Sequence, residues 1–311
     1  MLNLPKITDL DVTNKKVLLR LDLDTNPDLN DLRIKSSYET LDYLKDKASE
    51  IIILAHKGRP NGKFDESLSL KPFQKIFDKW GAQVHENLRF DPREMENDSK
   101  YAKELATLGD VYINDAFASS HRNHASIVSL PKLLPHAAGF RFEKEVNNLS
   151  KVFDPVRPLV ILISGIKKDK LEMIEPLSVL ADKVLVGGRL PAYAEISNSD
   201  KIILGNLIAD KEDITVNTIE KFKEEIAKAK TIVLAGVLGK YEDEGHSQGT
   251  KEIFTAVANS KAFKIAGGGD SLIAIERYNL TEKFDWISVG GGASLEFLTK
   301  KSLPGIEVLI H

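Results

Sequence analysis

Short apolar runs alternate with amphipathic stretches along nearly the whole chain, and this alternation restricts the possible folds more than any other feature. The apolar runs are 15–23, 50–56, 110–115, 159–164, 183–188, 201–205, 231–236, 263–268 and 286–291. Most are almost continuous in Val, Ile and Leu, which is typical of parallel strands buried on both faces. The pattern therefore predicts an α/β protein with doubly wound parallel sheets.

The stretches between these runs carry apolar residues at a spacing of three to four, which predicts helices. The clearest are 37–48, 69–80, 99–109, 215–230, 250–260 and 271–278. A chain of 311 residues is long enough for two domains. We expect a first domain at 1–141, an interdomain helix and linker at 142–157, and a second domain at 158–298. The tail 299–311 is expected to pack back on the first domain.

Composition excludes several kinds of site. There is no cysteine, so disulfides, thiolate nucleophiles and cysteine-based metal sites are absent from this sequence. A net charge of −3 argues against extensive binding to nucleic acid or to an anionic membrane. The first residues lack the pattern of a signal peptide, and the longest apolar runs are too short to span a bilayer. We expect a soluble, cytoplasmic protein.

Glycines follow four of the predicted strands in the second half: Gly187 and Gly188, Gly236 and Gly239, Gly267 to Gly269, and Gly290 to Gly292. Glycine lets backbone N–H groups approach a phosphate, and the N-terminus of a following helix favours negative charge. Ligands of open α/β sheets bind beyond the carboxyl ends of the strands. The second half therefore looks suited to a polyphosphate, although neither a P-loop nor a dinucleotide-binding glycine motif is present.

Arginines occupy comparable positions in the first half, within or after strands: Arg20, Arg33, Arg59, Arg89 and Arg122. Five guanidinium groups at one end of a sheet would repel one another unless an anion compensated them. This half therefore looks suited to a small anion with several charges. An anionic metabolite and a nucleotide on one chain suggest phosphoryl transfer.

The stretch INDAFASSHRNHAS (113–126) combines Asp115, His121, Arg122 and His124 with serines. Three interpretations are open for it. It could form a metal cluster, a hydrolase-like Ser/His/Asp set, or a cradle for an anionic substrate.

The chain resembles the phosphoglycerate kinase family in segments that cover almost its whole length. These are RLDLDTNP (20–27), DLRI (31–34), AHKGRP (55–60), ENLRF (86–90), LGDVYINDAFASSHRNHAS (108–126), AGF-x-x-EKE (138–145), GIKKDK (165–170), VGG (186–188), GVLGKYE (236–242), GGGDS (267–271) and GGGASLEFL (290–298). The resemblance implies a two-domain, hinge-closing kinase, and we expect a monomer. It would transfer a phosphoryl group between 1,3-bisphosphoglycerate and Mg-ADP, giving 3-phosphoglycerate and Mg-ATP in glycolysis or gluconeogenesis.

The resemblance also implies roles for individual residues. On the phosphoglycerate side these would be Arg20, Asp22, Asp24, Arg33, His56, Arg59, Arg89, His121 and Arg122, with Arg33 over the transferring phosphoryl group. On the nucleotide side they would be Lys167, Lys170, Gly187, Gly188, Gly236, Glu242, Gly268, Gly269, Asp270 and Ser271. Asp270 would contact Mg²⁺, and Gly291 and Gly292 would present helix N–H groups to the migrating phosphoryl group.

Several positions depart from the family pattern. Asp24 replaces an Asn, and Lys57 in the same region replaces an apolar residue and is either its compensation or a solvated side chain. The lysine motif is one residue shorter, so either Lys167 or Lys168 takes the first role; on a helix the pair would still share a face. A long segment with a nucleotide-binding loop is missing near 195–217. We expect a compact member with weaker or less base-selective nucleotide binding.

Two other functions compete with the kinase. One is a non-catalytic metabolite- or nucleotide-binding relative on the same scaffold, which the missing segment and the altered lysine motif favour. The intact arginine set and both triple-glycine turns favour the enzyme. The other is a metal-dependent hydrolase that uses His121 and His124 with Asp115. Its third ligand is unassigned, and the arginines would repel a cation.

Overall fold

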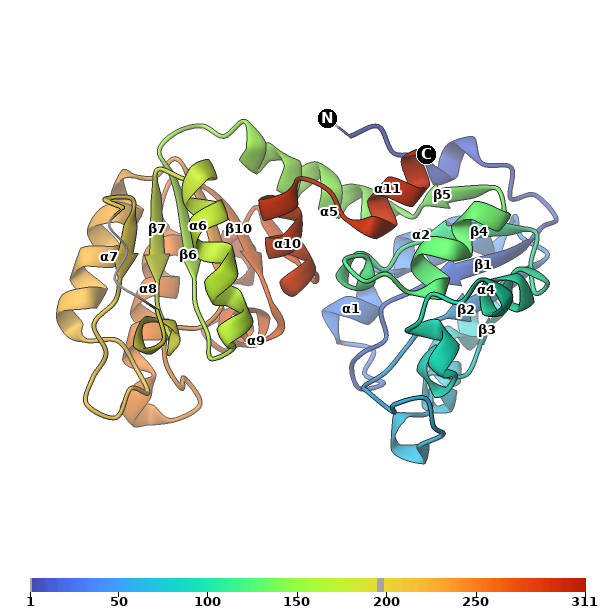
Figure 1. Ribbon diagram of the computed structural model, residues 1–311, viewed down its shortest axis with the longest axis horizontal. Helices are drawn as coiled ribbons and strands as arrows, with labels where there is room; N and C mark the ends of the chain where they lie inside the picture. Colours follow the sequence, from blue (N-terminus) through green and yellow to red (C-terminus); the bar gives the residue numbers. More distant parts are fainter. Residues whose placement is uncertain (1, 195–198) are drawn as a thin grey trace. The chain divides into compact units, whose positions relative to one another are not determined.

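The structure is a computed structural model, and it describes residues 2–194 and 199–311. The chain divides into two compact units (Figure 1). The first contains Met1–Asn147 together with Ser302–His311, and the second contains Asn148–Lys301. The division falls within helix α5 (Phe140–Ser150). Among the described residues, no helix combines the length and apolar character needed to cross a membrane.

The first unit contains a five-stranded parallel sheet in the order β3-β2-β1-β4-β5. The strands are β1 (Lys16–Arg20), β2 (Glu50–Leu54), β3 (Ala82–Val84), β4 (Val111–Asn114) and β5 (His136–Ala138). The helices are α1 (Leu32–Lys35), α2 (Tyr38–Lys45), α3 (Gln74–Phe77), α4 (Ser99–Ala106), α5 and, from the end of the chain, α11 (Pro304–Ile310).

Two apolar clusters cover the two faces of this sheet. One includes Leu41 and Leu44 of α2 with Phe73 and Phe77, and the other includes Tyr101 and Leu105 of α4. Alternate residues of β1 serve the two clusters, because successive side chains of a strand point to opposite faces. Burial on both faces explains why the strand is continuously apolar up to Arg20.

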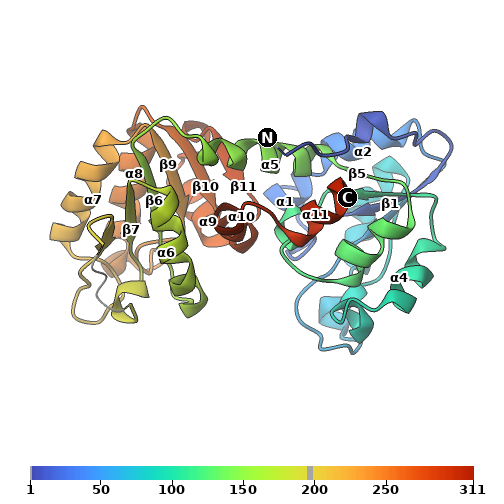
Figure 2. The same ribbon diagram turned by 45° about the horizontal axis from the view of Figure 1, so that its top comes forward.

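The second unit contains a six-stranded parallel sheet in the order β11-β10-β9-β6-β7-β8. The strands are β6 (Leu159–Ile163), β7 (Lys183–Val186), β8 (Ile202–Leu204), β9 (Thr231–Ala235), β10 (Phe263–Gly267) and β11 (Trp286–Ser288). The helices are α6 (Leu171–Leu180), α7 (Val216–Lys228), α8 (Gln248–Asn259), α9 (Gly269–Arg277) and α10 (Gly292–Lys300). Figure 2 shows α6 and α10 over one face of the sheet and α7 and α8 over the other. The predicted fold class, two doubly wound parallel-sheet domains, is confirmed.

Some local predictions were wrong or incomplete. The stretch 69–80 is not one helix: it consists of a 3-10 turn η3 (Lys71–Phe73), the short α3, and a second 3-10 turn η4 (Asp78–Trp80). Pro72 is tolerated only near the start of a helix, and Gly81 ends the segment in a left-handed conformation. The short strands β3 and β5 were not predicted.

Candidate active site

Arg20 lies at the carboxyl end of β1 and is fully buried. Its Nε donates to Ser126 Oγ at 3.0 Å, and its Nη2 lies 2.9 Å from His56 Nδ1. Its Nη1 donates to the carbonyl oxygen of Leu21. Because these contacts hold the guanidinium in one orientation, Arg20 forms the base of the predicted arginine set.

The buried carboxylate of Glu94 supports Arg20 through Ser126. Glu94 Oε1 accepts a hydrogen bond from Ser126 Oγ at 2.6 Å, and Oε2 accepts one from Ser126 N at 2.9 Å. Burial raises the pKa of Glu94, while Arg20 and Ser126 act in the opposite direction. Sequence reasoning did not identify Glu94, because 32 residues separate it from Ser126.

Two histidines lie beside this network. Burial lowers the pKa of His56 well below its ordinary value, and the charges of Arg20 and Arg122 add to the effect. For the same reasons the pKa of His124 falls to about 4. Both rings are therefore neutral near pH 7, and they contribute hydrogen-bonding groups to the site without adding positive charge.

The loop after β2 is attached to the site by backbone hydrogen bonds. Arg89 Nη1 donates to Gly58 O at 2.6 Å, and Gly58 N donates to Asp24 Oδ1 at 2.8 Å. The partner of Asp24 is thus a loop amide, whereas Lys57 Nζ donates to Ser67 O at 3.4 Å. The predicted compensation of the Asp24 charge by Lys57 is wrong, because Gly58 N donates to this carboxylate and Lys57 donates to Ser67 O instead.

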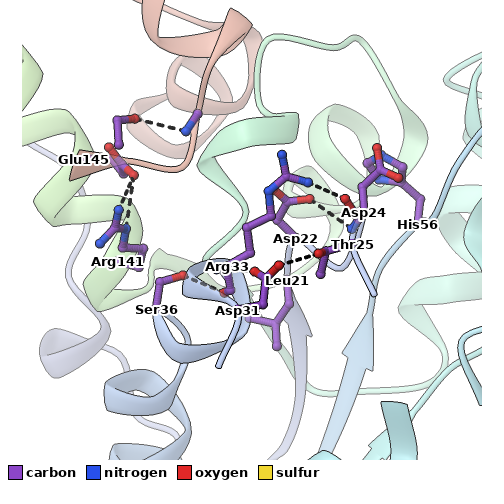
Figure 3. Close-up of polar contacts among 12 residues, drawn as sticks. Leu21, Asp22, Asp24, Thr25, Asp31, Arg33, Ser36, His56, Arg141 and Glu145 are labelled. Carbon is purple, nitrogen blue, oxygen red and sulfur yellow. Dashed lines mark hydrogen bonds and ion pairs between the residues drawn. The ribbon is translucent and has the colours of Figure 1, made fainter. Parts of the chain in front are cut away.

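Arg33 projects from the short helix α1 toward the loop that follows β1 (Figure 3). Asp31 caps this helix and accepts a hydrogen bond from Arg33 N at 2.7 Å. The guanidinium of Arg33 donates to the carbonyl oxygen of Asp24, and its Nε lies 3.8 Å from Asp22 Oδ2. The capping aspartate therefore aims Arg33 at the same loop that carries Asp22 and Asp24.

Arg122 and Arg59 belong to the same group of charges. Burial lowers the pKa of Arg122, and the nearby cations Arg59 and Arg20 lower it further, while Asp24 and Asp22 raise it. The arginine group, Arg20, Arg33, Arg59, Arg89 and Arg122, thus comes from a strand, two short helices and two loops of one unit. His121 directly precedes Arg122 in the same loop and is half-buried.

Asp115 does not belong to this group. It is buried, accepts a hydrogen bond from Phe142 N at 2.9 Å, and packs against Gly139 at the start of α5. Burial raises its pKa to about 6. Asn114 likewise stabilises the loop, because its Oδ1 accepts a hydrogen bond from Ala116 N at 3.0 Å. These two residues stabilise the backbone around the INDAF segment.

The side chains of this segment are therefore not arranged as a metal site or a Ser/His/Asp triad would require. The acid nearest to His124 is Glu94, at 3.8 Å, while Asp115 serves α5. Within residues 2–194 and 199–311, no group of three or more potential His, Cys, Asp or Glu ligands could hold a metal ion. The anion cradle is the interpretation that the contacts support.

The second unit contains a cavity of about 550 Å³. Its lining follows five strands or adjoining loops and consists of Gly165, Ile166, Gly188, Arg189, Glu212, Val237, Leu238, Gly239, Lys240, Tyr241, Glu242 and Asp270. A cavity of this size accommodates a ligand of nucleotide dimensions. Of the glycines predicted at strand ends, Gly188 and Gly239 line this cavity, and Gly165 after β6 joins them.

Two of these turns require glycine. Gly188 has φ +59°, and a Cβ there would lie 2.5 Å from Gly165 N. Gly236 has φ +116°, and a Cβ there would overlap the carbonyl oxygen of Ser164. Gly187, also after β7, packs against Leu238. Backbones of neighbouring strand ends therefore approach each other too closely for a side chain.

The side chain of Lys170 lies next to these turns. Its Nζ donates to Ser164 O at 2.5 Å and lies 3.0 Å from the position of a Cβ on Gly236. Burial lowers its pKa to about 8, although Asp270 and Asp169 act in the opposite direction. The lysine pair is not on an α-helix, because Lys170 ends the 3-10 turn η11 (Lys168–Lys170) and Lys167 precedes it in an extended conformation.

The two lysines before it differ in their surroundings. Lys168 Nζ lies 4.6 Å from the centroid of the Tyr193 ring. Lys167 lowers the pKa of Lys170 by repulsion, so its charge is close to that of Lys170. Of the two candidates for the first lysine role, Lys167 is the one whose charge acts on the pKa of Lys170.

The two triple-glycine turns begin helices α9 and α10. A Cβ on Gly291 would lie 3.3 Å from the Cα of Gly268, so the turns are neighbours. Gly269 and Gly292 are exposed first residues of these helices, and Asp270 is exposed in the first turn of α9. Ser271 is instead buried and accepts a hydrogen bond from Gly236 N at 2.9 Å. Its side chain connects two turns.

The cavity also contains an ion pair that was not predicted, between Arg189 and Glu212. A signal was available for Arg189, because it directly follows the glycine pair after β7. Glu212 comes from the shortened segment expected near 195–217. Its first four residues, 195–198, lie outside the described part of the chain.

Comparisons with known proteins agree on one family. The family model described as phosphoglycerate kinase matches residues 7–85, 81–194 and 191–301. The phosphoglycerate kinase of Herpetosiphon aurantiacus is 34% identical over 391 positions, covering 99% of each chain. That of Moorella thermoacetica is 33% identical over 385 positions, covering 97% of this chain and 98% of the other.

Solved structures agree as well. The phosphoglycerate kinase of Coxiella burnetii has a TM-score of 0.81 and 29% identity, with 99% of both chains covered. The phosphoglycerate kinase of Pyrococcus horikoshii has a TM-score of 0.84 and 25% identity, with 98% of both chains covered. The chain belongs to the phosphoglycerate kinase family.

Proposed function

We propose that the arginine group of the first unit binds 3-phosphoglycerate or 1,3-bisphosphoglycerate, and that the cavity of the second unit binds ADP or ATP. The reaction of the family is the reversible transfer of a phosphoryl group between 1,3-bisphosphoglycerate and ADP. Under this proposal the first unit is a phosphoglycerate-binding domain and the second a nucleotide-binding domain.

The observation that carries the substrate assignment is a pair of buried atoms in the arginine group. Asp22 Oδ2 and Arg89 Nε are both buried without a hydrogen-bond partner within the described chain. Such atoms are costly unless a ligand satisfies them. An oxygen-rich anion with a hydroxyl group would supply a donor for the aspartate and an acceptor for the arginine.

The chemistry follows from the charges. Phosphoryl transfer requires in-line positioning and cations around the equatorial oxygens, and little covalent work from the protein. Arg33, Lys167 and Lys170 are the proposed cations, with the N–H groups of Gly291 and Gly292. No general base is needed, because the acceptor oxygen is ionised in either direction.

Asp270 is the residue proposed to contact Mg²⁺. Its carboxylate is exposed in the first turn of α9 and lines the cavity. Mg²⁺ in kinases is held by one or two carboxylates together with substrate phosphates, so one acidic residue fits this mode of binding. The ion would neutralise phosphate charge during transfer.

The test is a coupled assay in which the protein is mixed with 3-phosphoglycerate and Mg-nucleotide, and acyl phosphate is consumed by an NADH-dependent dehydrogenase. In the variant Arg33→Ala we expect kcat to fall by about 10²- to 10³-fold, because one cation at the transferring group is lost. The control is Arg157→Ala, whose side chain is half-exposed and paired with Asp182. Turnover that is absent in the wild type would favour a non-catalytic binding protein.

Two further properties remain part of the proposal. A cytoplasmic location is supported by the metabolites that the family uses. A monomer is supported by the fact that each proposed ligand site is built from residues of one unit.

A further inference from the structure

Arg189 and Glu212 are two oppositely charged side chains that line the cavity of the second unit and contact each other. Their side chains retain 39% and 27% of their exposure, so both are accessible from the cavity. The rest of the lining consists of apolar and glycine residues together with Lys240, Tyr241, Glu242 and Asp270. In such a cavity a few placed polar groups determine which ligand is bound.

Backbone hydrogen bonds hold Arg189 and Glu212 in position. Arg189 N donates to Gly165 O at 2.9 Å, directly after the glycine turn at Gly188. Glu212 O accepts a hydrogen bond from Lys240 N at 2.9 Å. The next residue, Asp213, is buried and accepts from Gly249 N, also at 2.9 Å, at the start of α8. These hydrogen bonds therefore hold both residues of the pair in the wall of the cavity.

The position of the pair along the sheet indicates which part of a nucleotide it meets. Asp270 follows β10 and Arg189 follows β7, with β9 and β6 between them. Three strand spacings amount to about 14 Å. If the phosphates lie at Lys170 and Asp270, as in the proposed function, the base of an extended nucleotide lies toward Arg189 and Glu212.

The chemistry of the pair matches guanine better than adenine. Guanine presents two adjacent acceptors, O6 and N7, which suit a bidentate arginine. Next to them it presents two donors, N1–H and the 2-amino group, which suit a carboxylate. Adenine offers a single amino donor beside single ring-nitrogen acceptors, so it engages each charged group with only one hydrogen bond.

We propose that Arg189 and Glu212 recognise the base and make this chain prefer guanine nucleotides over adenine nucleotides. The arginine reads O6 and N7, and the glutamate reads N1–H and the 2-amino group. This inference rests on the proposed nucleotide site and specifies the nucleotide class that it takes.

The experiment is a calorimetric titration of the full chain with GDP, IDP and ADP in the presence of Mg²⁺. IDP retains O6, N7 and N1–H but lacks the 2-amino group. We expect GDP to bind most tightly, IDP less tightly and ADP most weakly. The ratio between GDP and ADP should be roughly 5- to 150-fold, the range expected for a bidentate base contact.

Two variants separate the two contacts. Arg189→Met should weaken GDP and IDP to a similar degree, because both bases lose the partner of O6 and N7. Glu212→Gln should reduce the difference between GDP and IDP, since the amide accepts fewer hydrogen bonds from the donor edge. Arg157→Met is the matched control, an arginine of the same unit that is paired with Asp182 and does not line the cavity. Its selectivity should equal that of the wild type.

Equal or tighter binding of ADP by the wild type would overturn the inference. A preference for GDP that survives both substitutions would overturn it too, because the base would then be read elsewhere. Turnover with 3-phosphoglycerate is measured separately with GTP and ATP. Selective binding without turnover contradicts the proposed function alone, whereas turnover that favours ATP contradicts the guanine preference alone.

Discussion

At the scale of single residues, burial determines the charge of several groups that the sequence marks only as titratable. His56 and His124 are neutral because they are buried beside arginines, so they leave the positive charge of the first site to the guanidinium groups. Lys170 keeps a charge near neutral pH, but with a pKa lowered to about 8. Residue type alone does not indicate these states, because they depend on neighbours that are distant in sequence.

Lys170 gives a pH-dependent prediction. The free protein loses the ammonium charge as the pH rises through about 8, and an anionic nucleotide binds better to the protonated form. Nucleotide affinity should therefore decrease above pH 8, and binding at pH 8.5 should take up protons. Calorimetry in two buffers with different ionisation enthalpies measures the uptake.

The matched variant for this prediction is Lys170→Arg. Arginine stays protonated throughout this range, so any remaining affinity should depend less on pH. An affinity of the wild type that is constant from pH 7 to 9.5 would show that Lys170 does not titrate in contact with the nucleotide.

At the scale of elements, strand ends and turns form the cavity, and their shapes are set by contacts between backbones. The short strands β3 and β5 escaped prediction because each has only three residues and no extended β-branched run. Their places at the two edges of the sheet come from pairing with β2 and β4. The predicted helix at 69–80 was broken into turns for a local reason, since Pro72 limits how it can begin.

The turn after β7 provides a test at this scale. In Gly188→Ala the new Cβ would meet the backbone of Gly165 at 2.5 Å, and the residue would keep a strained positive φ. We expect a loss of about 1–3 kcal/mol in stability and weaker nucleotide binding, because the turn must shift. Binding of 3-phosphoglycerate should be unchanged. Thermal unfolding and calorimetry with each ligand provide the measurements.

Gly245→Ala is the control for this substitution. Gly245 lies in the same unit, and a Cβ there would meet only Asp243 Oδ1 at 3.5 Å. Similar losses in both variants would mean that the effect comes from glycine content in general, and would contradict the role of the turn at Gly188.

At the scale of the whole molecule, the chain contains two units with separate cores, and its last ten residues belong to the first. Ile306 of α11 is fully buried, and Gly305 N donates to Ser120 O at 2.9 Å. The alignment with the Herpetosiphon relative spans 391 positions, whereas this chain has 311 residues, so at least 80 positions have no counterpart here. The chain is thus a compact member of its family, and both parallel sheets are present.

The membership of α11 in the first unit predicts where a mutation at the end of the chain acts. Ile306→Ala should cost about 2–5 kcal/mol through the lost contacts and the cavity left behind. Hydrogen exchange should show lower protection in β1 to β5 and unchanged protection in β6 to β11. The reciprocal variant is Ile253→Ala, which is fully buried in the core of the second unit and should reverse the pattern. Loss of protection in β6 to β11 on changing Ile306 would contradict this assignment.

The sequence by itself determined the fold class and the positions of nine strands, because apolar periodicity is a local feature. Only the tertiary structure decided which side chains meet. The carboxylate of Glu94 accepts a hydrogen bond from Ser126 N, that of Asp24 accepts one from Gly58 N, and that of Asp115 accepts one from Phe142 N in α5. Arg189 and Glu212 lie 23 residues apart and become partners only when β7 and the segment after β8 lie along one sheet edge. Such contacts depend on the packing of distant strands, which a pattern of residue types along the chain does not contain.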